Sequence, residues 1–151
     1  MKLIVAVDEE GGIARDGKIP WFFPEDIKFF RFMTMYNEVY MGRKTQDTLL
    51  QPLSKRQNFV LTRNEASVKQ GFRIASDGYL MYTSGFVIGG AEIYDLCLSP
   101  DYIDSVEDIY VTRVVGTYGC DRFFFVPDSF EKIAKIALSE ACTVERYCHA
   151  R

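Results

Sequence analysis

One carboxylate in this sequence stands among apolar side chains, a setting in which it could do acid–base chemistry. At about 100° per residue along a helix, Ile27, Phe29, Phe30 and Met33 fall around Asp26. A carboxylate buried without a partner is costly, so it must find hydrogen-bond donors or take up a proton, and such groups gather at functional sites. The pattern indicates a candidate catalytic acid. The alternative is a first-turn acid that faces solvent and stabilises the helix dipole.

Three short stretches combine glycines, cations and hydroxyl groups in the way that phosphate binding requires. Gly89-Gly90 precedes a helical pattern, where free N–H groups favour an anion. Gly42 is followed by Arg43-Lys44-Thr45, which adds two cations and a hydroxyl group, and Thr62-Arg63 follows another predicted strand. Each stretch alone is also compatible with a plain turn or a solvated surface. Together they indicate a site for a phosphorylated cofactor.

Composition excludes several other classes of function. The 18 Lys and Arg residues are outnumbered by 21 Asp and Glu residues, which gives a net charge of −3 and no support for nucleic-acid binding. The four cysteines have no CxxC spacing and the single histidine is His149, so no metal site is expected. The apolar run 3–7 is too short for a signal peptide or a membrane span. A cytoplasmic, reducing location is therefore expected.

The segments that must position these residues alternate between strands and helices. Strands are predicted at 3–7, 38–41, 58–62, 85–88, 108–112, 133–138 and 143–149. Helices are predicted at 24–35, 43–50 and 91–98. The order predicts an α/β fold in one domain over 1–151, with a mostly parallel central sheet of about eight strands flanked by about four helices and antiparallel strands added at one edge. In such a sheet, ligands bind beyond the carboxyl ends of the strands.

The motifs, taken in order, resemble those of the dihydrofolate reductase family. Its Pro-Trp-x-x-Pro-x-Asp signature is similar to 20–26, its Met-Gly-Arg-x-Thr motif to 41–45, and its Pro-Leu-x-x-Arg-x-Asn stretch to 52–58. The Ile-Gly-Gly-x-x-x-Tyr motif resembles 88–94, and Tyr110-Val111-Thr112-Arg113 and Cys120-Asp121 resemble the last two segments. The likeness covers essentially the whole chain, and the ordered set is far more specific than any single motif.

The resemblance implies that the chain reduces 7,8-dihydrofolate to tetrahydrofolate by hydride transfer from NADPH, which supports one-carbon metabolism and thymidylate synthesis. It implies that Asp26 holds the pterin ring with support from Thr112, and that Trp21 and Tyr94 complete the catalytic residues. The proton that N5 gains is expected to come from water, favoured electrostatically by the carboxylate. Arg56 is expected to clamp the carboxylate of the glutamate tail.

The remaining residues that the resemblance implies fall into two groups. The apolar substrate pocket is expected to consist of Ile4, Val5, Phe30, Leu49, Leu53 and Ile88. The NADPH site is expected to consist of Ala6, Ile13, Arg43, Lys44, Thr45, Thr62, Arg63, Gly89, Gly90, Ala91, Glu92 and Tyr94. The three cations among them fit a 2′-phosphate better than a bare ribose diol, which predicts a preference for NADPH over NADH.

The expected partners are dihydrofolate and antifolates such as methotrexate or trimethoprim, with neither nucleic acid nor membrane, and the family usually is monomeric. Two alternatives remain. A pteridine-precursor or riboflavin-pathway reductase would share the NADPH half, but would not be expected to keep Trp21 together with Asp26 and Arg56. A binding module without catalysis would bind the cofactor without turnover. An assay of NADPH oxidation distinguishes these possibilities.

Overall fold

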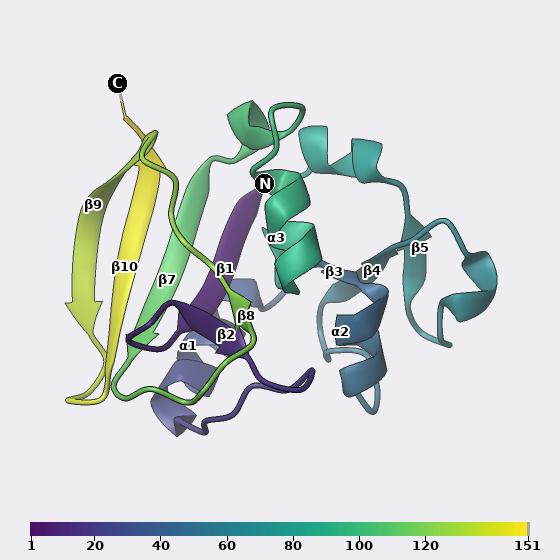
Figure 1. The fold of residues 1–151 in the computed structure, drawn as a ribbon. Coiled ribbons are helices and arrows are strands. Elements are labelled where there is room, and N and C mark those ends of the chain that lie inside the picture. The colour runs from purple at the N-terminus through teal and green to yellow at the C-terminus, as the bar shows by residue number, and fades with distance from the viewer. Residues whose placement is uncertain (151) are drawn as a thin grey trace.

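The β-branched and apolar runs of the sequence form one eight-stranded sheet, shown in Figure 1. The structure is a computed structural model that describes residues 1–150. The order across the sheet is β5-β4-β3-β6-β1-β7-β10-β9, and a separate small sheet pairs β2 with β8. The strands are β1 (Lys2–Val7), β2 (Gly12–Ala14), β3 (Glu38–Gly42), β4 (Gln57–Leu61), β5 (Arg73–Ala75), β6 (Phe86–Val87), β7 (Asp108–Val114), β8 (Arg122–Phe123), β9 (Phe130–Ala137) and β10 (Cys142–His149).

Three α-helices lie within the described residues, one fewer than the sequence predicted. They are α1 (Pro24–Thr34), α2 (Arg43–Thr48) and α3 (Ala91–Cys97), and short 3-10 helices lie in the connections at Glu65–Ser67, Asp77–Met81 and Ile103–Ser105. Pro24 stands at the start of α1, where its missing N–H costs nothing, and the chain turns away at Tyr36, whose φ is 63°. The helix count was wrong, but the α/β class and the mostly parallel sheet are confirmed.

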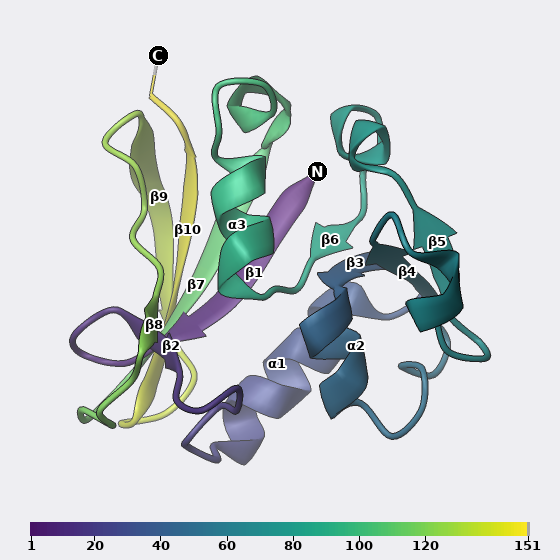
Figure 2. The ribbon, with the colours of Figure 1, turned by 45° about the vertical axis from the view of Figure 1, so that its right-hand side comes forward.

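The tail forms antiparallel strands at one edge of the sheet, as predicted. β10 pairs antiparallel with β7, and β9 pairs antiparallel with β10, whereas β1 pairs parallel with both β6 and β7. Figure 2 shows these tail strands on the opposite side of β1 from β3, β4 and β5. The edge that carries the tail is therefore separated in sequence and in space from the edge formed by β5.

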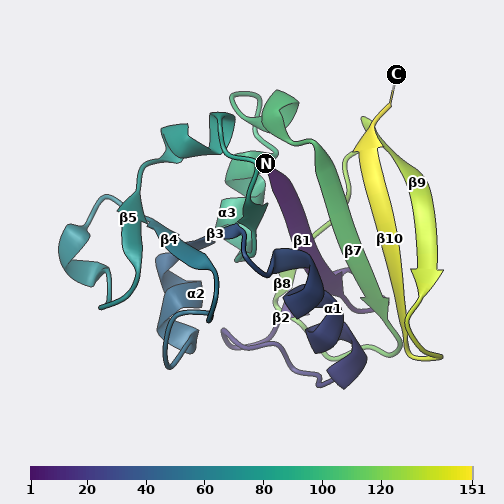
Figure 3. The same ribbon diagram turned by 180° about the vertical axis from the view of Figure 1, so that it is seen from behind.

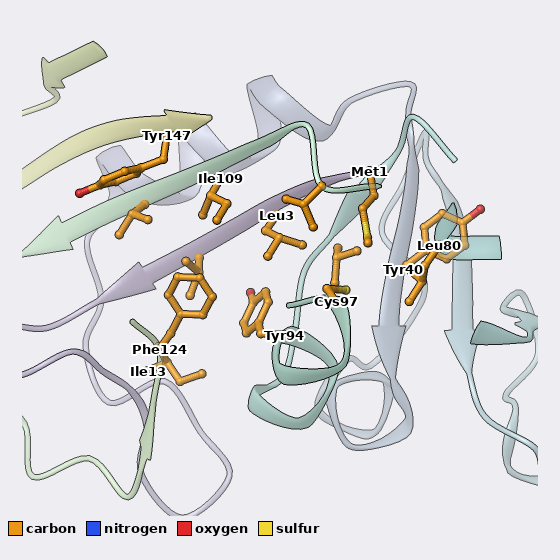
Figure 4. Packing of buried hydrophobic residues seen from close by; sticks show 14 of the residues in the cluster. Met1, Leu3, Ile13, Tyr40, Leu80, Tyr94, Cys97, Ile109, Phe124 and Tyr147 are labelled. Atoms are coloured by element: carbon orange, nitrogen blue, oxygen red, sulfur yellow. The ribbon is translucent and has the colours of Figure 1, made fainter. Parts of the chain in front are cut away.

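Helices α1 and α3 cover opposite faces of the sheet, so the core has two layers. Helix α3 lies in front of the sheet in Figure 1, and α1 lies in front of it in the reverse view of Figure 3. Alternate residues of β1 point to opposite faces of the sheet. Leu3 and Val5 pack in the hydrophobic cluster under α3, and Ile4 packs in the hydrophobic cluster under α1. Figure 4 shows the first cluster, in which Tyr94 of α3 lies beside Phe124.

Two large apolar residues of α1 do not belong to its buried face. The apolar pattern of the segment predicts a buried side made of Ile27, Phe29, Phe30, Phe32 and Met33, but Phe32 is 81% exposed and Ile27 is 51% exposed. Phe29, Phe30 and Met33 pack on the cluster under α1, and a helix of 3.6 residues per turn leaves Phe32 on the far side from Phe30. Across residues 1–150, no helix is both long enough and apolar enough to cross a membrane.

Candidate active site

A large cavity lies where two parallel strands separate. β1 pairs with β6 only at Lys2 and Leu3, whereas its pairing with β7 continues to Val7. After β6 the chain no longer pairs with β1 and stays beside β3. The hydrogen bond from the Ile88 amide to the Tyr40 carbonyl, at 2.9 Å, shows this. The parted carboxyl ends frame a cavity of about 890 Å³. This is the place at which an open α/β sheet is expected to bind its ligand.

Most of the residues predicted for the site line this one cavity. They come from strand ends, from the helices that follow them and from the segment after β1, which is why they are dispersed in sequence. The predicted residues that line the cavity are Ile4, Val5, Ala6, Ile13, Asp26, Phe30, Arg43, Lys44, Thr45, Leu49, Leu53, Ile88, Gly89, Gly90, Ala91, Glu92, Tyr94 and Thr112.

Four predicted residues lie outside the cavity lining. The Trp21 ring packs on the Tyr118 ring, with 5.2 Å between centroids. Thr62 and Arg63 follow the end of β4, where the Thr62 hydroxyl accepts a hydrogen bond from the Asn64 amide at 3.2 Å. Arg56 precedes β4 and is held against α1. None of these four residues lines the cavity, and their contact with a ligand remains a prediction.

Asp26 lies in the first turn of α1, half-buried, with its carboxylate in the cavity wall. Burial raises the pKa of Asp26; the Thr112 hydroxyl lowers it, and the charge of Glu25 raises it further. Thr112 itself is buried in β7, directly beside Ala6 of β1 in the sheet. The carboxylate therefore faces an apolar wall with one hydroxyl partner, the arrangement expected for a group that binds or protonates a substrate.

Two of the cations in the cavity lining, Arg43 and Lys44, lie at the start of α2. Arg43 Nη1 pairs with Asp47 at 2.6 Å, and Lys44 Nζ pairs with Glu92 at 3.2 Å across to α3. Both pairs are exposed, and exposed pairs of this kind contribute little to stability. These cations are therefore available to an anionic ligand at little cost.

The glycines between β6 and α3 allow the backbone to approach this cavity closely. Gly89 has a φ of 125°, a conformation that side-chain-bearing residues rarely adopt, and the peptide bond to Gly90 is cis. A Cβ placed on Gly90 would meet only Thr45 Oγ1, at 3.6 Å. The Gly42 amide donates to the Gly89 carbonyl at 2.9 Å, so the two phosphate-type motifs are joined by a hydrogen bond.

Tyr94 connects α3 to β1 at the floor of the cavity. Its buried hydroxyl donates to the Ile4 carbonyl at 2.6 Å, and burial raises its pKa well above the ordinary value. The hydroxyl is therefore a fixed neutral donor and not a proton source. The hydroxyl fixes the position of Ile4 relative to Gly89. A Cβ added at Gly89 would lie 3.4 Å from this hydroxyl.

Further lining residues were not among the predicted site residues, and several of them come from the loop after β2 and from the start of β8. They are Ala14, Asp16, Gly17, Lys18, Ile19, Ile27, Gly42, Thr48, Leu61, Ile93, Asp121 and Arg122. Gly42 among them had been noted only as the glycine before Arg43-Lys44-Thr45. A signal for part of this set was present. Asp16-Gly17 is the dipeptide typical of a type I′ turn, and both residues have positive φ between Arg15 and Lys18, which bond to each other. A tight turn there directs the loop over the cavity.

The comparisons with known proteins agree with one another. The family model described as dihydrofolate reductase matches residues 1–148. A dihydrofolate reductase of Bacillus subtilis is 32% identical over 149 residues, covering 95% of this chain and 84% of that protein. One from Staphylococcus aureus is 30% identical over 134 residues, covering 87% and 80%. A solved dihydrofolate reductase from Enterococcus faecalis, complexed with NADP(H) and RAB-propyl, superposes with a TM-score of 0.82 at 28% identity, covering 99% and 96%.

The chain belongs to the dihydrofolate reductase family. Family membership confirms the expected fold, the class of enzyme, an NADPH-dependent oxidoreductase, and the reduction of dihydrofolate to tetrahydrofolate. Among residues 1–150, no group of three or more His, Cys, Asp or Glu side chains is placed to hold a metal ion. The roles of the individual residues in this dihydrofolate reductase rest on their positions in the cavity.

Proposed function

We propose that the cavity between β1 and β6 is where this chain reduces 7,8-dihydrofolate, with Asp26 as the residue on which the reaction depends. The observation that carries the proposal is the position of the Asp26 carboxylate, half-buried in the apolar wall beside Thr112. Carboxylates are seldom kept in apolar surroundings without a functional reason. The cation-lined half of the same cavity supplies the second requirement, a site for a phosphorylated cofactor.

Asp26 would bind the pterin ring through its 2-amino group and N3, both of which present hydrogens to a carboxylate. Thr112 would hold the carboxylate in place from β7. In the apolar wall the negative charge is poorly screened, so it favours arrival of a proton at N5 of the ring more strongly than it would in water. The proton would come from water, and Asp26 would not need to transfer it directly.

The other half of the cavity fits NADPH, which supplies the hydride. Gly89 and Gly90 leave the backbone open there, and the cations of Arg43 and Lys44 stand at the same end. Arg63 follows the neighbouring strand and would add a third cation for the 2′-phosphate. The chain's own contribution is to align the nicotinamide ring with the pterin ring and to keep water away, which lowers the barrier by orientation.

Arg56 would bind the glutamate tail of the substrate. Its Nε donates to the Ser54 carbonyl at 2.9 Å and its Nη1 to the Thr34 hydroxyl at 2.9 Å. Among residues 1–150, its Nη2 makes no hydrogen bond within the protein, so one edge of the fork is left for a ligand. Burial lowers the pKa of Arg56, and the nearby charge of Arg31 lowers it further. A carboxylate ligand would relieve that unfavourable burial of charge.

The deciding experiment follows nicotinamide absorbance when the purified chain meets NADPH and dihydrofolate, with NADH and methotrexate in parallel. We expect turnover with NADPH that methotrexate blocks. NADPH binding without turnover of any folate would contradict the proposal and favour the binding module. Turnover of a pteridine precursor in place of dihydrofolate would favour the runner-up reductase.

We further propose that the chain is one monomeric domain of the cytoplasm and that antifolates such as trimethoprim compete with dihydrofolate. The cysteines support a reducing compartment, since Cys97, Cys120, Cys142 and Cys148 are all free thiols. Sedimentation of the purified chain at several concentrations tests the monomer. A mass that rises with concentration would contradict it.

A further inference from the structure

A second cavity lies on the α3 face of the sheet, away from the cavity that holds Asp26. It has a volume of about 390 Å³ and is bounded by Val111 and Arg113 of β7, Tyr147 of β10 and the segment 124–130. That volume is within the range of about 300 to 1,000 Å³ that is typical of small-molecule sites. We refer to it below as the β7–β10 cavity.

The β7–β10 cavity is distinct from the active site because a strand presents alternate residues to opposite faces. Thr112 lines the Asp26 cavity, and its neighbours Val111 and Arg113 line the β7–β10 cavity. No residue lines both. A ligand in the second cavity would therefore leave room for both dihydrofolate and NADPH.

Arg113 is the cation in the lining of the β7–β10 cavity, and it is paired with a buried carboxylate, Glu145, which lies outside the lining together with Lys132. Glu145 is only 4% exposed, forms ion pairs with Arg113 and Lys132, and accepts a hydrogen bond from the Tyr147 hydroxyl at 2.8 Å. Burial alone would raise the pKa of Glu145, but Lys132, Arg113 and Tyr147 together lower it to about 2. Glu145 is thus fully charged at neutral pH, and the three charged groups sum to one positive charge.

Arg113 has hydrogen-bonding capacity left over. Its Nε donates to Glu145 and its Nη2 to the Tyr147 hydroxyl at 3.1 Å, while Nη1 donates to no group within residues 1–150. The Arg113 side chain is 46% exposed, so it can reach a ligand. A guanidinium with a free edge is the usual partner of a carboxylate.

The other walls of the β7–β10 cavity are aromatic. The rings of Phe124, Phe130 and Tyr147, which are largely buried, line the cavity together with Val111 and the exposed ring of Phe125. Figure 4 shows Phe124 and Tyr147 on the same side of the sheet as Ile109. Rings of this kind bind another ring by stacking or edge-to-face contact. Asp128, exposed and also part of the lining, disfavours a second negative charge on the ligand.

From these features we propose that the β7–β10 cavity binds a small aromatic monocarboxylate. The ring would lie against Phe124, Phe130 and Tyr147, and the carboxylate would accept hydrogen bonds from Arg113. Uncharged rings would lack the second contact, and aromatic dicarboxylates would meet Asp128. The proposal is independent of the function assigned to the Asp26 cavity.

Benzoate is the probe, titrated into the chain saturated with NADPH and followed by amide NMR. We expect saturable shifts at residues of β7, β10 and 124–130. Benzamide and phthalate are expected to bind at least about tenfold more weakly, the loss that corresponds to one charge-assisted contact. Shifts confined to Ile4, Phe30 and other residues of the Asp26 cavity, or equal binding of benzamide, would overturn the proposal.

Two variants and a control locate the contact. Arg113→Lys keeps the charge beside Glu145 but removes the fork, and is expected to weaken benzoate binding about tenfold. Asp128 is exposed and lies outside the network around Glu145, so Asp128→Asn leaves that network intact. This variant is expected to bind benzoate more tightly. Asp104→Asn, on the exposed 3-10 helix at Ile103–Ser105, should have no effect. If Arg113→Lys does not fold, the test rests on Asp128→Asn. Equal affinities of Asp128→Asn and Asp104→Asn for benzoate would then overturn the proposal.

Discussion

The hydroxyl of Thr34 accepts a hydrogen bond from Arg56 Nη1 at 2.9 Å and donates one to the Phe30 carbonyl at 2.8 Å. The side chain proposed to bind the substrate's glutamate tail is thus fixed to the last turn of α1, the helix that carries Asp26 in its first turn. One helix therefore sets the distance between the two ends of the bound substrate.

Thr34→Val tests that connection, since valine has a similar shape but no hydroxyl. Thr34 is fully buried, and the change removes the hydrogen bond of Arg56 to α1 while leaving the one to the Ser54 carbonyl. We expect the KM for dihydrofolate to rise by about 2- to 10-fold, the size of one lost hydrogen bond, with kcat and the KM for NADPH unchanged. Arg56→Ala should raise the same KM further. Steady-state kinetics measures both effects, with Thr143→Val as the control. An equal rise of the KM for dihydrofolate and the KM for NADPH in Thr34→Val would refute the connection.

Asp26→Asn should remove most of the activity. The amide cannot supply the negative charge that favours proton arrival at N5, so we expect kcat to fall by about 100- to 10,000-fold. The cation-lined half of the cavity is untouched, and NADPH should therefore bind with the affinity of the unmodified chain, as measured by fluorescence titration. Near-normal turnover would remove Asp26 from its proposed role.

The same variant is expected to be more stable than the parent chain at neutral pH. Because the pKa of Asp26 is raised in the folded state, the folded chain holds this proton more tightly than the unfolded chain. The free energy of unfolding of the parent chain then falls as pH rises from the ordinary pKa of Asp to the raised pKa of Asp26. The stability gained by Asp26→Asn should reach its full size above the raised pKa and vanish below the ordinary one. Urea unfolding at several pH values measures it, and a gain independent of pH would contradict this account.

Much of the architecture could be predicted from the sequence because the strands are short runs of apolar residues with clear ends. The segments that contain Leu3–Val7, Val39–Met41 and Val60 are buried on both sides, and buried parallel strands are near-continuous apolar runs. The rule that ligands bind at strand carboxyl ends then places Gly42 and Gly89 near each other without any structure. Asp26, which lies on a helix, was connected to them only by the resemblance to the dihydrofolate reductase motifs.

The parts that could not be predicted depend on contacts between distant residues. β2 and β8 have three and two residues, too few to show alternation, and they pair across more than 100 positions of sequence. The Asp16 amide donates to Asp121 Oδ2 at 3.0 Å, which brings both residues to the cavity, and neither has a local signal for this contact.

Arg43→Gln is expected to reduce the preference for NADPH. The 2′-phosphate is present in NADPH and absent from NADH, so a cation that binds it affects only the first cofactor. We expect the KM for NADPH to rise about tenfold and the KM for NADH to stay constant. Arg73→Gln on the edge strand β5 is the control, since Arg73 lies outside the cavity lining. Equal changes with the two cofactors would show that Arg43 acts elsewhere than at the phosphate.

Asp8 is expected to hold the loop after β1 to the segment after β7. The Asp8 carboxylate is 2% exposed and accepts hydrogen bonds from the amides of Glu10, Gly12 and Tyr118 at 2.8 to 3.2 Å. Burial by itself would raise its pKa, but these donors outweigh burial and the pKa is lowered. Both segments lead to residues that line the Asp26 cavity, so Asp8 positions one wall of the site.

Asp8→Asn replaces an acceptor oxygen with a donor group that cannot pair with backbone amides. We expect the free energy of unfolding to fall by about 1 to 3 kcal/mol, the cost of a buried hydrogen-bonding group left without a partner. Because the pKa of Asp8 is lowered in the folded state, its stabilising contribution is present above the ordinary Asp range and is lost as pH falls through the folded-state pKa. The difference between parent and variant, measured by urea unfolding against Asp101→Asn, should therefore be largest near neutral pH and shrink on acidification. A difference that grows at low pH would mean that the carboxylate is not the group that joins the two segments.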